Sequence, residues 1–402
     1  MKKVPRLRFR GFQEDWELCK LSTEFEKVNE RNDGSLGKEH WISVAKMYFQ
    51  NPDKVQSNNI DTRTYVMRTG DIAFEGHPNK EFKFGRFVAN DIGTGVVSEL
   101  FPIYRHKQEY DNYYWKNAIQ IERVMGPIFA KSITSSGNSS NKLDPNHFLR
   151  QQVFIPKLEE QKKIGLFLKK LDDTITLHQR KLDQLKELKK AYLKAMLISM
   201  NTKNNKVPKL RFADFEGEWD QRKFKAFSKK TGKKNSQNLN YPAYSVSNKS
   251  GLISQSEQFN GNRLDTLEKH SYKIVEPYEF AYNPARINVG SIAFNTLGKP
   301  VIVSSLYVVL QMEDNLNNDF ILQFIKSPAF VREVKRNTEG SVREYLFYEN
   351  FANIKFPYTK NIKEQQKIGA FFKKSDDTIA LRQNKLNQLK ALKKAYLQNM
   401  FI

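Results

Sequence analysis

The chain has 402 residues, of which 39% are hydrophobic and 12% aromatic, and it carries a formal net charge of +23. This length favours more than one hydrophobic core, and the apolar content excludes an intrinsically disordered chain. The excess of Lys and Arg favours a polyanionic partner, with nucleic acid first, although a solvated Lys-rich surface would give the same composition.

Cys19 is the only cysteine, which excludes a disulfide framework and a Cys-based zinc site within the chain. The N-terminus turns charged again before an apolar stretch develops, and Ser304 and Ser305 split the longest apolar run. We therefore expect no signal peptide, no membrane partner and a cytoplasmic location.

The first half opens with the motif Val4-Pro5-Arg6-Leu7-Arg8-Phe9, followed by Trp16. From there to residue 156, short apolar and aromatic runs are separated by Gly, Asn, Asp and Pro. Such runs predict strands and turns with a few helices, so we expect an α+β domain over residues 1–156.

A long helix is predicted over residues 157–198, because apolar residues recur there at an alternating spacing of four and three. His178 fills one gap in that series, and Pro156 limits where the helix can begin. The predicted coiled-coil seam consists of Ile164, Leu168, Leu171, Ile175, Leu182, Leu185 and Tyr192.

A polar linker is expected over residues 199–206, followed by a second α+β domain over 207–357 and a second helix over 358–402. The second half opens with Val207-Pro208-Lys209-Leu210-Arg211-Phe212 and Trp219, which match the first opening motif. The seam of the second helix consists of Ile368, Phe372, Ile379, Leu386, Leu389 and Tyr396, with Ser375 and Arg382 as polar interruptions.

The two helices are copies of one element, since about 26 of roughly 37 positions are identical between residues 160–196 and 364–400. A period of about 200 residues indicates duplicated domains and not a solenoid. A helix with such a seam needs a partner, and an internal two-fold relation would make the two copies pack antiparallel. The alternative is that each helix packs only on its own domain.

Candidate nucleic-acid contacts are polar and basic residues in loops, because Lys and Arg bind phosphates while Arg, Asn, Gln, Ser and Lys reach base edges. Any single candidate could equally be an ordinary surface residue. In the first domain they are Lys46, His77, Asn79, Lys80, Lys83, Arg86, Ser135, Ser136, Asn138 and Lys142. In the second they are Ser247, Asn248, Lys249, Asn283, Arg286, Ser341 and Arg343.

The lysine pairs of the helices could follow a DNA backbone or simply solubilise the outer helix face. These pairs are Lys169-Lys170, Lys189-Lys190, Lys373-Lys374 and Lys393-Lys394.

No catalytic or metal site is predicted. An adenine methyltransferase needs an Asn-Pro-Pro-aromatic loop, and the nearest text, Asn283-Pro284-Ala285-Arg286, lacks the second Pro and the aromatic residue. Gly-x-Gly-x-x-Gly and Gly-Lys-Ser/Thr loops are also absent from the sequence. Asp53, Glu81 and Lys83 could supply a metal-dependent nuclease, but this fragment has no counterpart in the second half.

The duplicated opening motifs, together with Glu-Gln-x-Lys-Ile-Gly and Asp-Asp-Thr-Ile in both helices, resemble the specificity subunits of type I restriction-modification systems along essentially the whole chain. The resemblance implies two target-recognition domains that read the two parts of a bipartite double-stranded DNA site, and an antiparallel coiled coil that acts as a ruler between them. It also implies two methyltransferase subunits and motor-nuclease subunits as partners. S-adenosylmethionine, ATP and magnesium would bind to those partners and not to this chain.

Two other functions stay open at this point. One is a stand-alone tandem DNA-binding regulator, and the other is a single-chain restriction or modification enzyme built on the fragment around Asp53 and Glu81.

Overall fold

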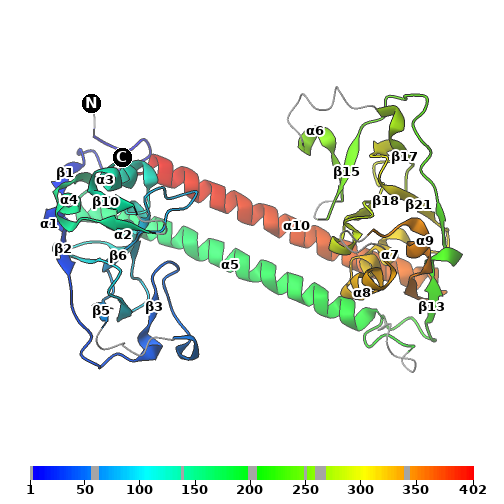
Figure 1. Ribbon diagram of the computed structural model, residues 1–402, viewed down its shortest axis with the longest axis horizontal. Coiled ribbons are helices and arrows are strands. Elements are labelled where there is room, and N and C mark those ends of the chain that lie inside the picture. Colours follow the sequence, from blue (N-terminus) through cyan, green and yellow to red (C-terminus); the bar gives the residue numbers. More distant parts are fainter. Residues whose placement is uncertain are drawn as a thin grey trace. The chain divides into compact units, whose positions relative to one another are not determined.

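The computed structural model describes residues 3–55, 63–136, 140–197, 206–248, 251–258, 269–338 and 345–402. The chain divides into two compact units (Figure 1). The first unit comprises residues 1–180 and 384–402, and the second comprises residues 181–383. Each of the two long helices, α5 (Leu158–Met196) and α10 (Ile362–Asn399), therefore contributes one end to each unit. The expected linker over 199–206 lies outside the described residues, apart from Lys206.

The first unit has short strands and helices in an α+β arrangement. Its strands are β1 (Glu17–Lys20), β2 (Phe25–Val28), β3 (Ile42–Ser43), β4 (Tyr48–Phe49), β5 (Thr64–Met67), β6 (Ile72–Glu75), β7 (Arg86–Ala89), β8 (Gly95–Ser98), β9 (Ile103–His106), β10 (Ile133–Ser136), β11 (Asn141–Leu143) and β12 (Gln152–Ile155). Its helices, besides the helical turns of the loops, are α1 (Leu21–Glu24), α2 (Asn112–Ala118), α3 (Glu122–Ser132) and α4 (Pro145–Arg150).

The second unit follows the same plan. Its strands are β13 (Asp220–Lys223), β14 (Ser228–Lys230), β15 (Tyr244–Ser247), β16 (Gly251–Ser254), β17 (Lys273–Val275), β18 (Phe280–Tyr282), β19 (Ile292–Phe294), β20 (Val301–Val303), β21 (Val308–Met312) and β22 (Lys355–Tyr358). Its helices, apart from similar short turns, are α6 (Gln255–Gln258), α7 (Asn318–Ile325), α8 (Pro328–Asn337) and α9 (Tyr348–Asn353).

Sheet topology shows that the two units share one framework. A four-stranded antiparallel sheet has the order β2-β9-β6-β7 in the first unit and β14-β21-β18-β19 in the second. Around it, the pairs β1-β12, β5-β8 and β3-β4 correspond to β13-β22, β17-β20 and β15-β16. The expected duplication of an α+β domain is therefore confirmed at the level of strand pairing.

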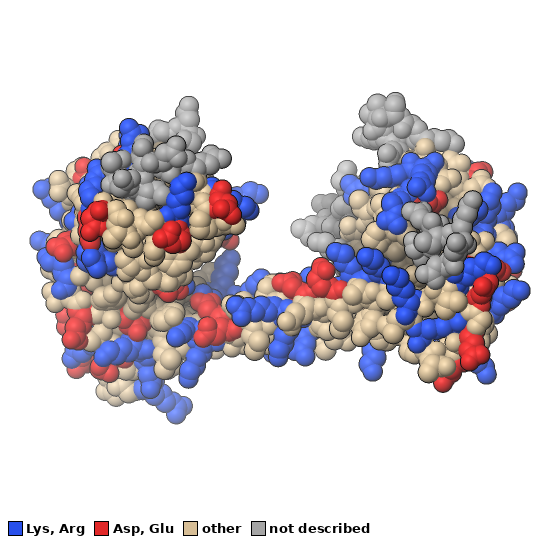
Figure 2. Space-filling model, turned by 90° about the horizontal axis from the view of Figure 1, so that it is seen from below, with Lys and Arg blue, Asp and Glu red and all other residues tan. Residues whose placement is uncertain are grey.

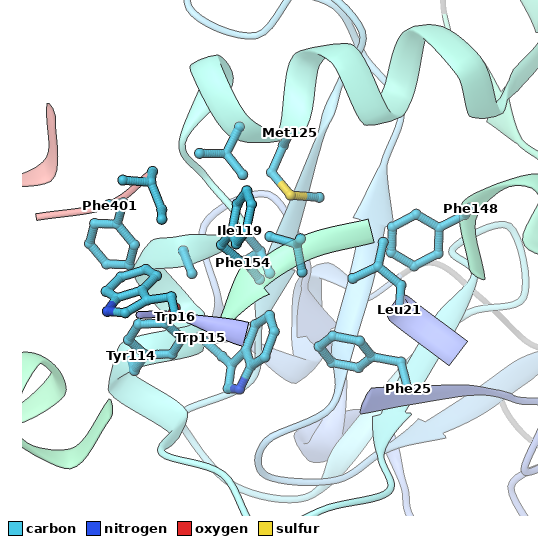
Figure 3. A pocket seen from close by; sticks show the side chains of 14 residues that line it. Trp16, Leu21, Phe25, Tyr114, Trp115, Ile119, Met125, Phe148, Phe154 and Phe401 are labelled. Atoms are coloured by element: carbon cyan, nitrogen blue, oxygen red, sulfur yellow. The ribbon is translucent and has the colours of Figure 1, made fainter. Parts of the chain in front are cut away.

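Each unit has its own apolar core, in which the opening Trp is almost completely buried. In the first unit, Trp16 packs edge-on against Tyr114 and Phe401, at centroid distances of 6.3 Å for both pairs (Figure 3). In the second unit, Trp219 contacts Phe320 of α7 in the same way, at 5.8 Å. The space among the rings in Figure 3 is narrow and lined by apolar side chains, which is the character of a packed core and not of a polar ligand site.

The long helices run antiparallel within each unit. In the first unit, the Phe167 ring lies 4.8 Å from that of Tyr396, and further along Lys393 Nζ lies 2.7 Å from Asp172 Oδ1. In the second unit the same contacts occur with the roles of the helices exchanged: Tyr192 meets Phe371 at 5.3 Å, and Lys189 Nζ meets Asp376 Oδ1 at 2.5 Å. The predicted antiparallel pairing is confirmed. Among the described residues, no helix is both long and apolar enough to cross a membrane.

Candidate nucleic-acid interface

A buried ion pair fastens each opening motif to a repeat helix. Arg8 donates from Nε and Nη2 to the two carboxylate oxygens of Glu160, both at 2.7 Å. Arg211 makes the equivalent bidentate pair with Glu364, at 2.7 and 2.9 Å. The two glutamate residues are only 1% and 0% exposed, so each carboxylate depends on its arginine. Both motifs can be recognised in the sequence, whereas the pairing, across 152 and 153 residues, cannot.

The remainder of the Glu-Gln-x-Lys-Ile-Gly motif seats a domain helix on the repeat helix. Gln161 Oε1 accepts from the backbone N–H of Asp111, the N-cap of α2, and Gln365 Oε1 accepts from that of Asn317, the N-cap of α7. The glycine four residues further on leaves room for that cap. A Cβ on Gly165 would collide with the Asp111 carboxylate. The repeated motif is therefore a docking element that fixes the orientation of each domain on its helix.

Three loops of the first domain meet at one edge, and most of the candidate residues lie there. The β6–β7 connection carries four of them and Arg86 begins β7, and the Gly76 carbonyl of the connection accepts from the N–H of Asn141 at the start of β11. β11 pairs with β10, which brings Lys142 opposite Ser135. The tip of the β3–β4 hairpin, with Lys46, is tied to the same place by a bond from Arg86 Nη2 to the Ala45 carbonyl, at 2.5 Å.

A buried carboxylate organises two of these candidates. Glu75 Oε1 lies 2.6 Å from His77 Nδ1, and Glu75 Oε2 lies 3.7 Å from Arg86 Nε. The Arg86 guanidinium also stacks on the Phe82 ring, at 5.2 Å from its centroid. Because Glu75 is 6% exposed while His77 is exposed, the buried carboxylate positions the side chains of His77 and Arg86 near the surface. Asn79 has a structural role, since its Oδ1 accepts from the N–H groups of Glu81 and Phe82 and closes the turn.

The second domain assembles the equivalent edge from different side chains. The Pro284 carbonyl accepts from the N–H of Leu346, as the Gly76 carbonyl does from Asn141. Ser291 has the position that Arg86 has in the first domain, and its Oγ donates to the Val246 carbonyl of β15 at 2.8 Å, as Arg86 donates to the Ala45 carbonyl. Asn283 Oδ1 caps the turn by accepting from Ala285 N–H, and Arg286 is exposed beside it.

The remaining candidates divide by position. Lys80, Lys83, Lys142 and Asn248 are exposed, and Ser247 is half-buried opposite Gly251. Asn138, Lys249, Ser341 and Arg343 lie outside the described residues, and Ser135 and Ser136 are described by their backbone only. The structure thus gathers the described candidates of each domain at one edge. Which of them touch DNA stays a prediction.

The expected seam residues take three positions. Ile164 and Leu168 lie in the core of the first unit, and Ile368 and Phe372 lie in that of the second. Leu182 and Leu386 are fully buried. The others are half-buried: Leu171, Ile175, Leu185, Tyr192, Ile379, Leu389 and Tyr396, as are His178 and Ser375, whereas Arg382 is exposed.

Several helix lysines are already engaged. Lys189 and Lys393 pair with Asp376 and Asp172 of the neighbouring helix, and Lys169 lies over the Tyr113 ring at 4.8 Å. Lys170, Lys373 and Lys374 point into solvent, and Figure 2 shows basic side chains along the long helices as well as on both units. In three of the four pairs, one lysine therefore contacts another part of the protein.

The first unit also contains a histidine with a strongly shifted pKa. His106, at the end of β9, is stacked on Tyr110 at a centroid distance of 3.8 Å. Burial lowers the pKa of His106 to about 3, so the imidazole is neutral at physiological pH. Within the described parts of the chain, no three His, Cys, Asp or Glu side chains lie close enough together to hold a metal ion.

Comparison with known proteins places these features in a family. Residues 89–187 and 218–391, more than half of the chain, match the model of the type I restriction modification DNA specificity domain. The MjaVIII specificity subunit of a type I restriction enzyme from Methanocaldococcus jannaschii is 21% identical, over 95% of this chain and 91% of that protein.

Two solved structures share the fold. The S subunit of a type I restriction-modification system from M. genitalium has a TM-score of 0.62 at 12% identity, over 99% of both chains. A chain from a study of complex assembly and conformational transition of the type I R-M system has a TM-score of 0.51 at 13% identity, over 96% of this chain and 97% of that one. This protein therefore belongs to the type I restriction-modification DNA specificity family.

Proposed function

We propose that the chain is the DNA-reading subunit of a type I restriction-modification enzyme, and that each domain reads one part of a bipartite site. The observation that carries the proposal is the loop edge, by which we mean the edge of each domain where its candidate residues and their loops meet. Two domains with one framework present different side chains at the equivalent edge, Glu75, His77 and Arg86 in one and Asn283, Ser291 and Arg286 in the other. A fixed scaffold with divergent loops is what the reading of two different half-sites requires.

The test is co-expression with the neighbouring methyltransferase subunit, followed by single-molecule sequencing of methylated adenines in host DNA. The proposal expects a bipartite methylated motif that disappears when this chain is removed. In addition, Arg86→Ala should relax or alter one half of that motif, and Arg286→Ala the other half only. A methylome that does not depend on the chain would instead favour a stand-alone DNA-binding regulator.

Catalysis is assigned to the partner subunits. In this proposal the chain binds neither S-adenosylmethionine nor ATP nor magnesium, and its role is to bring the partners to the site in the cytoplasm. Incubation of the purified chain alone with DNA, magnesium and S-adenosylmethionine should give neither cutting nor methylation. Either activity would favour the single-chain enzyme.

Two methyltransferase subunits are proposed to dock on exposed leucine residues of the long helices. Leu166, Leu177 and Leu188 of α5 recur every 11 residues, so they share one helix face, and they are 50%, 50% and 49% exposed. α10 repeats the last two as Leu381 and Leu392, which are 70% and 44% exposed. Two copies of one apolar row suit two copies of one partner.

This stoichiometry can be tested with single charges. Leu177→Glu and Leu381→Glu should each remove one methyltransferase subunit from the complex, as measured by native mass spectrometry. Thr176→Glu and Ala380→Glu place the same charge one residue away on exposed positions of the same helices and serve as matched controls. Retention of both partner subunits in the leucine variants would show that this face is not the docking surface.

A further inference from the structure

The second unit carries a group of lysine residues on neighbouring strands with little neutralising charge. Lys234 forms an antiparallel bridge with Lys273 of β17, so two cationic residues stand directly opposite each other. Lys230 is near enough to act electrostatically on Lys273. Lys229 and Lys233 are exposed on the same strand as Lys230 and on the segment that continues it. We call Lys230, Lys234 and Lys273 the lysine cluster.

A hydrogen bond holds Lys273 in place without cancelling its charge. Lys273 Nζ donates to the backbone carbonyl of Tyr307 at 2.6 Å, which fixes the position of the ammonium group. Burial and the charges of Lys230 and Lys234 lower the pKa of Lys273. Among the described residues, Lys234 and Lys273 have no carboxylate partner, and Lys230 has Glu349 at 3.4 Å with both side chains more than half exposed.

The first unit has the same backbone arrangement but neutralises it. The Asn32 side chain bonds the N–H and C=O of Leu36, as Asn235 does with Leu239, which aligns the two segments residue by residue. Arg31, which precedes Asn32, bridges to Tyr65, just as Lys234 bridges to Lys273. Here, however, the cation lies over the Tyr65 ring at 4.6 Å, and its Nη1 lies 2.7 Å from Glu99 Oε2.

The neutralising acids are the positions at which the two units differ. Glu99 corresponds to Ser305, because each lies between a strand-end serine and an exposed leucine whose N–H faces that serine's Oγ. Glu30 corresponds to Lys233, and Glu30 pairs with Arg68 and Arg105 in the first unit. One set of positions is therefore balanced in the first unit and strongly positive in the second.

Folding alone gives no reason for this charge. Like charges directly opposite each other on paired strands destabilise a sheet. An external anion removes that repulsion and gains from the positive potential. Because only one unit has the cluster, a protein partner that binds both units in equivalent copies does not explain it. DNA does, since two different half-sites and their flanks need not be contacted symmetrically.

The cluster also lies at a suitable distance from the base-reading candidates. Lys273 is on β17, β17 pairs with β20, and β20 is bridged at Ile302 to Ala243, beside β15. At about 4.8 Å per strand, Lys273 is roughly 10 Å from Ala243, where the β15–β16 hairpin begins. Ser247 and Asn248 lie at the other end of β15, roughly 13–17 Å further along the strand. The separation between the cluster and these residues therefore corresponds to about five base-pair steps of B-DNA.

We propose that the lysine cluster binds backbone phosphates of the DNA next to the half-site read by the second domain. The inference rests on the proposed function of the chain. The cluster supplies affinity and register and carries no base specificity, because Lys reaches phosphates as a point charge.

The test measures the salt dependence of DNA binding by the full chain in complex with its methyltransferase subunit, on a duplex with the methylated motif. Lys234→Gln/Lys273→Gln should lower the slope of log K against log salt by about two and weaken binding at 0.1 M salt on the order of 10- to 100-fold. The methylated motif should stay the same. Lys273→Tyr/Ser305→Glu, which installs the arrangement of the first unit, should have a similar effect.

The matched control removes the equivalent groups of the first unit. Arg31→Gln/Glu99→Gln deletes a neutral pair and should leave the slope unchanged. Thermal unfolding at low salt verifies folding, and the cluster variants should melt at the same temperature as wild type or higher because repulsion is removed. If the wild-type complex binds the motif and the cluster variants keep the same slope, the inference is overturned and the proposed function is not. The inference is also overturned if the cluster variants lose the methyltransferase subunit while their DNA binding keeps the slope of the wild type. A wild-type complex that does not bind the motif overturns the proposed function itself.

Discussion

Substitution of Arg8 tests whether the buried ion pair is what fastens the first domain to its helix. Arg8→Met keeps most of the side-chain length but removes two charge-assisted hydrogen bonds of 2.7 Å. Glu160, with a side chain 2% exposed, is left as an unpaired buried carboxylate. Such a loss costs about 3–5 kcal/mol. Since the Arg8 side chain is itself 15% exposed, water screens part of the charge, and we expect the lower end, about 3 kcal/mol.

Hydrogen exchange on the full chain is the suitable assay, because a chain of two units need not unfold in one step. Amides of α2 and of the first turns of α5 should lose about 3 kcal/mol of protection, while the second unit is unaffected. Arg6→Met, an exposed neighbour with the same change in charge and size, is the control.

A double substitution separates pairing from packing. Replacing both partners, Arg8→Met with Glu160→Met, removes the unpaired charge and should recover most of the lost protection. In the second unit, Arg211→Met should cost less, since Glu364 keeps a hydrogen bond from Thr359 Oγ1 at 2.8 Å. If Arg8→Met costs less than about 1 kcal/mol, or if the double variant is as unstable as the single one, the ion pair is not what fastens the domain to its helix.

Three further predictions follow from the same structure. Gly165→Ala should lower the free energy of unfolding by about 1–3 kcal/mol by overpacking α2 against α5, despite the gain in helix propensity. Calorimetry of this variant measures the net effect, and calorimetry of Ala191→Gly measures the helix propensity alone. Because the pKa of His106 is lowered to about 3, the free energy of unfolding of the first unit should fall by up to about 1.4 kcal/mol for each pH unit below about 6.5, since the unfolded chain then binds the proton. Urea titrations of His106→Phe should show a free energy of unfolding that depends less on pH. Deleting Lys181–Glu187 together with Lys385–Ala391, one heptad from each long helix, should shorten the spacer of the methylated motif by about 3 base pairs and leave both half-sites unchanged, and methylome sequencing gives the answer.

The repeat was the most predictable part of the molecule. A seam such as Ile164 and Leu168 has the period of a helix, and a second copy in the same chain supplies the partner, so antiparallel helices follow from the sequence. The α+β character followed from short runs bounded by turn residues. The strand order β2-β9-β6-β7 did not, because strands of four residues have no pattern that selects their partners.

The candidate site was predictable by composition and not by role. Asn79 and Arg86 were both expected near DNA, yet Asn79 uses its side-chain oxygen to close a turn, while Arg86 joins two loops through Glu75 and Ala45. Sequence spacing cannot distinguish a polar residue that bonds its own backbone from one that faces outward. The Arg8–Glu160 pair was missed for a related reason: its partners are 152 residues apart, and only their recurrence as Arg211–Glu364 hints that they belong together.

The two units differ where they can differ at little cost to folding. The docking groups are shared, since Arg8, Gln161 and Gly165 recur as Arg211, Gln365 and Gly369 with the same contacts. They are buried and mutually dependent, so a change in one leaves a charge or an N–H unpaired. The loop-edge residues bond mainly to backbone groups, as Arg86 does to the Ala45 carbonyl and Asn283 to the Ala285 N–H, and unrelated side chains can make such bonds equally well. Changes in DNA specificity should therefore accumulate at the loop edge without disturbing how each domain is held on its helix.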